Sequence, residues 1–310
     1  MKCFYHSADL DGQCSGAIVK HFYPECELIG INYGRPFPWD AIEKNEPVFM
    51  VDFSLQPFED MIRLANLATL VWIDHHKTAI DESVARHIEK AISGLREVGR
   101  AGCELTWEYI QEFVMRDKPE KAPVPLAVHL LGRYDVWDLK NPQVLAFQYG
   151  MRTYNTDPND QGFWGRFFEP DEFPGWEVDG IIWKGEAILE YEAQSNAKYM
   201  AAAAFPVLFD GLKCLAVNKL LSNSKLFESA WDRNKYDAML AFGYRGKGWT
   251  VSLYSDREDV DVGEVCKRRG GGGHKGAAGF QCDVLPFRVS PIYETDLALG
   301  RKFPASFGVN

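Results

Sequence analysis

Acidic and histidine side chains that could hold metal ions occur in short segments along the first half of the chain. Carboxylates close together repel one another unless a cation neutralises them. Mixed carboxylate and imidazole ligands suit Mn²⁺, and also Zn²⁺, Fe²⁺ or Co²⁺. Two such ions about 3.5–4 Å apart would activate a water for in-line displacement at phosphorus. The segments are His6 with Asp9 and Asp11, then Asp52, then Asp74-His75-His76, and finally Asp135.

Each of these residues also has an ordinary structural explanation. An Asp after a strand commonly caps a helix or forms a turn, which is the favoured interpretation of Asp9 or Asp52 taken alone. A lone His is more often solvated than a ligand. The metal hypothesis therefore depends on the elements that bring the segments together.

The first three segments follow short apolar runs that predict β-strands. These runs are residues 2–6, 47–51 and 69–73, and a further strand is expected within 26–33. Helical patterns near 14–22 and 56–68 alternate with them. This alternation predicts an α/β fold with a doubly wound, mainly parallel sheet. Because the carboxyl ends of parallel strands meet at one edge, the segments should converge on one crevice.

A long helical pattern at 176–204 predicts a connecting helix between two domains. We expect a metal-binding catalytic domain at 1–175 and a smaller α/β substrate-binding domain at 205–285, followed by a tail at 286–310. Near the middle of the chain, Tyr154, Phe163 and Trp164 could stack on a base, but packing is the favoured interpretation.

Four consecutive glycines at 270–273 precede His274 and Lys275. Glycines let the backbone approach a ligand closely and leave N–H groups free for phosphate. Arg269 adds positive charge beside them. A flexible linker is the alternative, but a predicted helix at 260–269 and the compact segment 277–279 argue against it.

Composition restricts the classes of partner. The chain has 310 residues, 46% hydrophobic and 25% charged, as in globular proteins with a core. Its net charge of −10 disfavours non-specific coating of long nucleic acid, although a local basic pocket remains compatible. Seven scattered cysteines without a CxxC pair predict reduced thiols, and we expect a cytoplasmic protein without signal peptide or membrane span.

Taken in order, these motifs resemble those of the DHH phosphoesterase superfamily. They are His6-x-x-Asp9-x-Asp11-Gly12, Val51-Asp52-Phe53, Asp74-His75-His76 and Tyr134-Asp135, and residues 270–274 resemble the GGGH motif of the associated C-terminal domain. Members include RecJ-type exonucleases, oligoribonucleases of the nano-RNase type, cyclic-dinucleotide phosphodiesterases and family II pyrophosphatases. The resemblance covers most of 1–145 and 205–283. Each motif alone is weak, whereas all five in this order form a specific signal.

The resemblance implies two divalent ions, with Mn²⁺ favoured and Mg²⁺ or Co²⁺ as options. His6 and Asp9 would bind the first ion. Asp11, His75 and Asp135 would bind the second, and Asp52 would bridge both. His76 would lie beside the scissile phosphate, and Asp74 would orient a ligand histidine. The residues implied in substrate binding are Arg269, Gly271, Gly272, Gly273, His274 and Lys275.

The leading hypothesis is a metal-dependent phosphodiesterase that hydrolyses short oligonucleotides, or linear or cyclic dinucleotides, to mononucleotides. One alternative is a phosphatase acting on a small phosphomonoester such as a 3′-phosphoadenosine nucleotide, or on pyrophosphate. The GGGH segment counts against pyrophosphatase activity. Another is a non-catalytic nucleotide sensor, against which the intact acidic motifs argue. We expect no binding to long duplexes or membranes, and a homodimer is one option for the oligomeric state.

Overall fold

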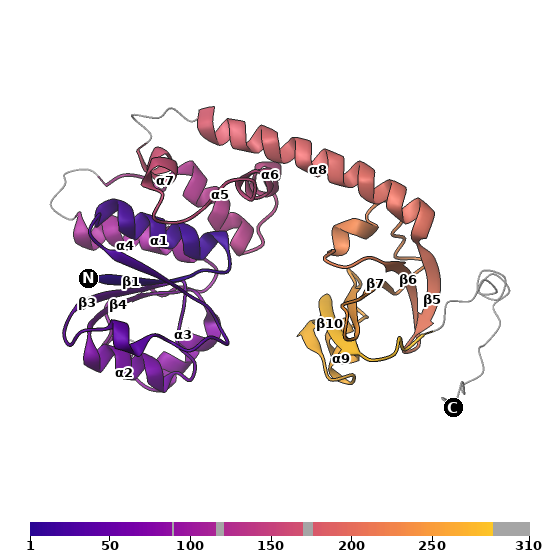
Figure 1. The fold of residues 1–310 in the computed structure, drawn as a ribbon, viewed down its shortest axis with the longest axis horizontal. Helices are drawn as coiled ribbons and strands as arrows, with labels where there is room; N and C mark the ends of the chain where they lie inside the picture. Colours follow the sequence, from indigo (N-terminus) through magenta and orange to yellow (C-terminus); the bar gives the residue numbers. More distant parts are fainter. Residues whose placement is uncertain (89, 116–120, 170–175, 288–310) are drawn as a thin grey trace. The chain divides into compact units, whose positions relative to one another are not determined.

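The structure, a computed structural model, describes residues 1–88, 90–115, 121–169 and 176–287 (Figure 1). The chain forms two compact units, Met1–Leu189 and Glu190–Asn310. Their boundary falls inside the long helix α8, Trp176–Ala203, which spans the pattern predicted to be a connecting helix. All but two residues of the predicted tail, 286–310, lie outside the described residues.

The first unit is built on a four-stranded parallel sheet in the order β2-β1-β3-β4. The register of β1 with β3 reaches Tyr5↔Val51, and that of β3 with β4 reaches Val51↔Ile73. Three strands therefore end at the same edge, as the sequence predicts. The strands are β1 Lys2–His6, β2 Glu27–Ile31, β3 Pro47–Val51 and β4 Thr69–Ile73.

Helices cover both faces of this sheet (Figure 1). Cys3 and Ile73 belong to the core on the side of α1 and α4, whereas Phe4 and Trp72 belong to the core on the side of α2 and α3. Alternate strand residues thus bury against opposite helix layers. This confirms the predicted doubly wound parallel sheet. The helices are α1 Leu10–Phe22, α2 Glu59–Leu67, α3 Lys77–Ala85 and α4 Gly102–Tyr109.

More helices complete the first unit beyond α4. The π-helix η2, Ile110–Val114, continues α4 directly. The structure also places a helix, α7, before the long helix α8, where the sequence analysis predicts no element. The remaining elements are the 3₁₀ turn η1 Trp39–Ala41 and the helices α5 Leu126–Asp135, α6 Pro142–Met151 and α7 Gln161–Phe168.

The second unit has a six-stranded sheet in the order β5-β6-β7-β8-β10-β9. Only the β6–β7 pair is parallel among these described strands. The smaller α/β domain expected from the sequence is therefore present. Its elements are β5 Phe205–Phe209, β6 Leu212–Asn218, η3 Ser224–Phe227, β7 Ala238–Tyr244, β8 Trp249–Tyr254, α9 Val262–Lys267, β9 Gly272–His274 and β10 Ala277–Cys282.

Two glycines allow α6 and α8 to touch backbone to backbone within the first unit. A Cβ on Gly185 would lie 1.7 Å from the carbonyl oxygen of Ala146, and one on Gly150 would lie 2.1 Å from that of Ile181. Elsewhere on α8, a Cβ on Gly180 would have no neighbour within 4 Å. The same helix therefore offers one glycine that packing requires and one that it does not.

We predict opposite effects for alanine at these two positions. Gly185→Ala forces α8 away from α6 and should lower the free energy of unfolding by about 2 kcal/mol or more, as overpacking does. Gly180→Ala should raise it by up to about 1 kcal/mol, because Ala favours a helix. Urea unfolding of both variants measures the difference. Equal effects at the two positions would contradict the close packing of α6 and α8.

Candidate metal centre

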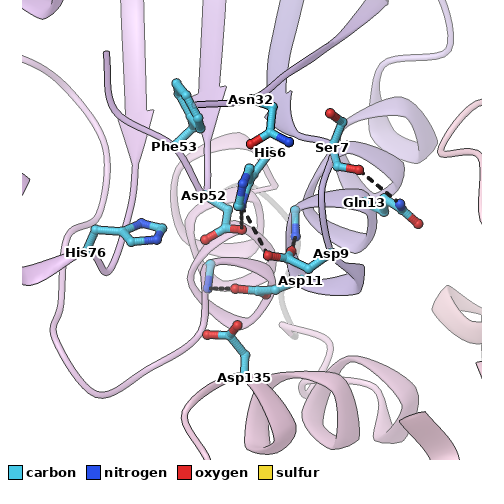
Figure 2. Close-up of polar contacts among 12 residues, drawn as sticks. His6, Ser7, Asp9, Asp11, Gln13, Asn32, Asp52, Phe53, His76 and Asp135 are labelled. Atoms are coloured by element: carbon cyan, nitrogen blue, oxygen red, sulfur yellow. Dashed lines mark hydrogen bonds and ion pairs between the residues drawn. The ribbon is translucent and has the colours of Figure 1, made fainter. Parts of the chain in front are cut away.

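The six predicted metal ligands lie together at the carboxyl edge of the parallel sheet. Figure 2 shows all of them except His75. His6 ends β1, Asp52 directly follows β3, and Asp135 ends α5. His75 lies two residues after the end of β4. Together with His76, which was not predicted as a ligand, the six residues form three overlapping groups, each with one ligand atom per residue and all these atoms within 4.8 Å of one another. The groups are His6–Asp9–Asp52, Asp11–His75–Asp135 and Asp52–His75–His76.

Asp9 serves as a helix cap and still faces the cluster. Helix α1 begins at Leu10, earlier than its apolar pattern predicts, so Asp9 is its N-cap. Oδ1 accepts a hydrogen bond from the Gly12 N–H at 3.0 Å, whereas Oδ2 lies 3.2 Å from Nδ1 of His6. One oxygen thus satisfies the cap and the other remains available. The cap and ligand interpretations of Asp9 are compatible.

Asp11 lies in the first turn of α1 and is almost completely buried. Its oxygens accept hydrogen bonds from the Gly102 and Cys103 N–H groups at 2.8 and 2.7 Å. These N–H groups belong to the first turn of α4, where backbone donors lack partners within the helix. The α4 terminus therefore stabilises the negative charge of Asp11. Asp11 Oδ2 still lies 3.7 Å from Nε2 of His75.

Asp52 occupies the centre of the cluster. Its side chain is 2% exposed, and it belongs to two of the three groups, as a bridging ligand would. Oδ1 lies 3.1 Å from Nε2 of His75, and Oδ2 lies 3.6 Å from Nδ1 of His6. The backbone of Asp52 is left-handed, with φ at 53°, while its N–H remains bonded to the Ile73 carbonyl. This sparsely populated conformation carries strain that the surrounding sheet maintains.

Gly102 is a site residue that the sequence pattern does not identify. A Cβ at this position would lie 2.6 Å from Cβ and 2.9 Å from Oδ1 of Asp52. Only glycine therefore lets the start of α4 approach both Asp11 and Asp52. The sequence signal is limited to a glycine that stands directly before a stretch with apolar residues at helical spacing, such as Leu105 and Tyr109. Its partners are distant in sequence, so the pattern alone does not show its role.

Asp74 positions His76. The buried Asp74 Oδ1 accepts hydrogen bonds from the backbone N–H groups of His75 and His76 and lies 2.6 Å from Nδ1 of His76. Its other oxygen accepts from Nε1 of Trp72 at 3.2 Å. The ring of His75 instead faces Asp52 and Asp135, at 3.1 and 3.3 Å. The histidine that Asp74 orients is therefore His76, whose Nε2 is directed away from Asp74.

The charges of the cluster are unbalanced without a cation. Burial favours neutral His6 and His75, but neighbouring carboxylates, above all Asp52, outweigh it and raise the pKa of His6 to about 10 and that of His75 to about 9. Burial, together with the charge of Asp52, also raises the pKa of Asp135 to about 6, although His75 opposes this. Protons thus occupy positions where a metal would supply charge.

Unpaired atoms also fit a metal site. Nδ1 of His6 and Oδ1 of Asp52 are buried and have no hydrogen bond of acceptable geometry, despite their short ion-pair distances. Buried polar atoms are normally satisfied, so these two indicate a missing partner. A divalent cation would satisfy both. Oxygen and imidazole donors together suit Mn²⁺ and related metals.

The glycine segment is an edge strand of the second unit. Gly271 precedes β9, which contains Gly272, Gly273 and His274 and pairs with β10, so a flexible linker is excluded. His274 and Lys275 are exposed. Arg269 is less available, because its guanidinium lies 4.7 Å from the ring centre of Phe209 and 3.5 Å from Asp210. The helix before the glycines is shorter than predicted, ending at Lys267.

The central aromatics are used in packing, as the sequence favours, and two of the three lie in the core. Trp164 and Phe163 are buried among the helices of the first unit, and only Tyr154 is exposed. None of the helices in the described part of the chain has the length and apolar character needed to cross a bilayer.

No family model matches the chain. Its sequence is 27% identical over 249 residues to the uncharacterized protein R106 of Acanthamoeba polyphaga mimivirus, covering 76% of this chain and 53% of that protein. The chain thus spans about half the length of this curated relative. The solved pGpG-specific phosphodiesterase PggH of Vibrio cholerae matches with a TM-score of 0.52 and 13% identity over 91% of this chain and 93% of PggH. The two proteins therefore share a fold.

RecJ of Thermus thermophilus, solved in complex with Mg²⁺, matches with a TM-score of 0.42 and 14% identity. The match covers 98% of this chain and 50% of RecJ.

We predict that Asp135→Asn stabilises the metal-free protein and weakens metal binding. A carboxyl group whose pKa is raised by folding lowers stability as pH rises from about 4 through about 6. At pH 7.5 the substitution should therefore add about 1–2 kcal/mol of stability in EDTA. It should weaken Mn²⁺ binding by more than about tenfold, since even outer partners of metal ligands contribute that much.

Thermal unfolding in EDTA and across a Mn²⁺ titration measures both effects. Asp138→Asn is the matched control, because Asp138 follows α5 and belongs to none of the three groups among the described residues. A destabilised Asp135→Asn protein with an unchanged Mn²⁺ response would refute the assignment of Asp135.

Proposed function

We propose that this chain is a metal-dependent phosphodiesterase of the DHH type that hydrolyses short oligonucleotides or dinucleotides to mononucleotides. The observation that carries the proposal is the set of three ligand groups at one sheet edge, which overlap because Asp52 and His75 each belong to two of them. The motif order in the sequence supports it, as does the fold shared with a pGpG-specific phosphodiesterase. Mn²⁺ is the favoured ion, with Mg²⁺ or Co²⁺ as options.

The residues of the centre divide the work. His6 and Asp9 would hold one ion, Asp11, His75 and Asp135 the other, and Asp52 both. Bound together, two such ions would activate water and stabilise charge on the phosphate. Asp52, the residue assigned to both ions, is buried and its carboxylate pairs with the imidazoles of His6 and His75.

His76 would act on the substrate itself. Its Nδ1 is fixed by Asp74, which leaves Nε2 to contact a phosphate oxygen or to donate a proton to the departing oxygen. The ring centres of His75 and His76 lie 4.7 Å apart, and one ring nitrogen of His76 lies within 4.8 Å of ligand atoms of Asp52 and His75. Asp74 therefore acts through His76 as a positioning residue.

The glycine segment would bind a phosphate group of the substrate. Among Gly271, Gly272 and Gly273, Gly272 supplies backbone beside open space, since a Cβ there would meet no atom within 4 Å. Gly271 and Gly273 lie against β10, where a Cβ would be 2.1 Å from the Gly279 carbonyl oxygen and 2.5 Å from that of Ala277. The exposed His274 and Lys275 add hydrogen-bond donors. Arg269 adds positive charge nearby, which Asp210 partly neutralises. A short substrate suits a chain with net charge −10, because only a local basic surface is required.

We predict Mn²⁺-dependent release of mononucleotides from a short substrate. The purified chain is offered a labelled linear dinucleotide, a cyclic dinucleotide, a 3′-phosphonucleotide and pyrophosphate, each with Mn²⁺ or with EDTA. We expect cleavage of at least one dinucleotide with Mn²⁺ and none with EDTA. Hydrolysis of the monoester alone would replace the proposal with a phosphatase, and hydrolysis of nothing, with tight nucleotide binding, would identify a sensor.

We further predict that Asp52→Asn lowers kcat by at least about 100-fold, because it removes the carboxylate shared by two ligand groups. Asp160→Asn is the control, since its carboxylate caps α7 by accepting from the Phe163 N–H, a role that Asn can replace. Steady-state kinetics and metal analysis of both proteins test this. Normal activity and metal content in Asp52→Asn would exclude Asp52 as the bridging ligand.

A further inference from the structure

A pocket of about 760 Å³ lies beside the metal centre within the first unit. Its walls come from the end of β2 and the segment after it, residues 30–39, and from Ser7, Phe53, Leu55, Gln56 and Asp60. Ser7 and Phe53 immediately follow His6 and Asp52, so the pocket and the metal centre share a wall. Figure 2 shows Asn32 and Phe53 beside His6. The motifs of the sequence do not include this segment.

Tyr33 presents an aromatic surface in this pocket. Its ring stacks on the buried Phe53, with centres 4.3 Å apart and planes at 27°, while 43% of Tyr33 remains exposed. The ring centres of His6 and His76 lie 5.7 and 6.3 Å from that of Tyr33, both edge-on. Tyr33 therefore connects the pocket to the two histidines expected to face metal and phosphate.

The other aromatic rings of the pocket are engaged elsewhere. Phe37 contacts Phe4 and Trp39, and the guanidinium of Arg63 covers the Trp39 ring at 3.8 Å. Tyr33 is therefore the ring that is both supported from behind and open to a ligand.

Asn32 adds a polar group beside this ring. Its Oδ1 accepts a hydrogen bond from the Tyr33 N–H at 2.8 Å, which fixes the amide. Within the described part of the chain, its Nδ2 makes no hydrogen bond, and an amide N–H₂ can donate to a ring nitrogen or carbonyl of a base. A planar support with an adjacent amide is the chemistry that recognises a nucleobase.

We propose that this pocket binds the base of the nucleotide whose phosphate lies at the metal centre, with Tyr33 as the stacking surface and Asn32 as an edge-reading group. The inference rests on the proposed phosphodiesterase function, because it takes the phosphate to be held by the metal ligands. Only one ribose separates a base from its phosphate, so a base whose phosphate is at the metal centre would lie next to that centre. The pocket lies next to it on the side of His6, because Ser7 and Tyr33 line the pocket and adjoin His6. The volume is within the usual range of small-ligand pockets.

The test separates the base from the phosphate. Calorimetry on the full chain with Mn²⁺ compares adenosine 5′-monophosphate with ribose 5-phosphate, and phosphate release is monitored so that both ligands are known to be intact. We expect the base to improve Kd by on the order of tenfold or more, as base stacking on an aromatic ring does. Tyr33→Leu should remove most of this ratio, whereas Tyr33→Phe, which retains the ring, should preserve it.

Tyr154→Leu is the matched control. Tyr154 is 40% exposed and packs on Phe163 with ring centres 5.4 Å apart, much as Tyr33 packs on Phe53, but it does not line this pocket. In Tyr154→Leu, the ratio of the Kd for ribose 5-phosphate to the Kd for adenosine 5′-monophosphate should equal that of the wild type. Equal affinities for the two ligands in the wild type, or an unchanged ratio in Tyr33→Leu, would overturn the pocket.

The outcome is independent of the hydrolysis assay. A base preference that depends on the Tyr33 ring, in a protein that cleaves no dinucleotide, would uphold the pocket and refute the phosphodiesterase. Dinucleotide cleavage without a base preference would support the phosphodiesterase and refute the base pocket.

Discussion

Burial of several carboxylates at one sheet edge is the constraint on which the first unit depends. Asp11, Asp52 and Asp74 are each 3% exposed or less, and burying a charge is unfavourable unless it is paired. Asp11 accepts backbone N–H groups of α4, and Asp74 accepts those of residues 75 and 76. The carboxylate of Asp52 has imidazoles beside it but no hydrogen bond from a backbone donor among the described residues. The buried carboxylate without a backbone donor is therefore the one that the proposed cations would neutralise.

The same constraint explains the close packing around the site. A helix terminus stabilises an acid only when its first N–H groups reach the oxygens, so α4 must approach the strand ends. Gly102 permits that approach beside Asp52. Gly12 does the same for α1, because a Cβ there would lie 2.0 Å from the carbonyl oxygen of His6. Gly12, Gly102 and the left-handed backbone of Asp52 thus allow the helix termini to approach the buried carboxylates closely.

The sequence predicts those parts of the site that depend on local patterns. Apolar runs ending in Asp or His place His6, Asp52 and His75 on strand ends, and parallel pairing then brings them together. Contacts between distant segments are not accessible in this way, as Gly102 shows by donating to Asp11 from 91 residues away. The aromatic-rich α7 was not predicted because it has only eight residues, two of which are glycines, and it follows a segment rich in Asn, Asp and Pro. Asp135 was found by its motif, whereas its place at the end of α5 needed the structure.

Strand ends and loops carry different parts of the proposed chemistry. The proposed metal ligands lie at the ends of strands and helices, and the register of the parallel sheet fixes the positions of the strand ends. Tyr33 and Asn32 stand instead on the segment after β2, beside Gly34 with its φ of 75°, where the chain turns without disturbing the sheet. A loop can change its side chains at little expense to the fold. Substitutions in this loop are therefore compatible with an unchanged cluster around Asp52, and the proposed base contacts can be altered separately from the proposed metal ligands.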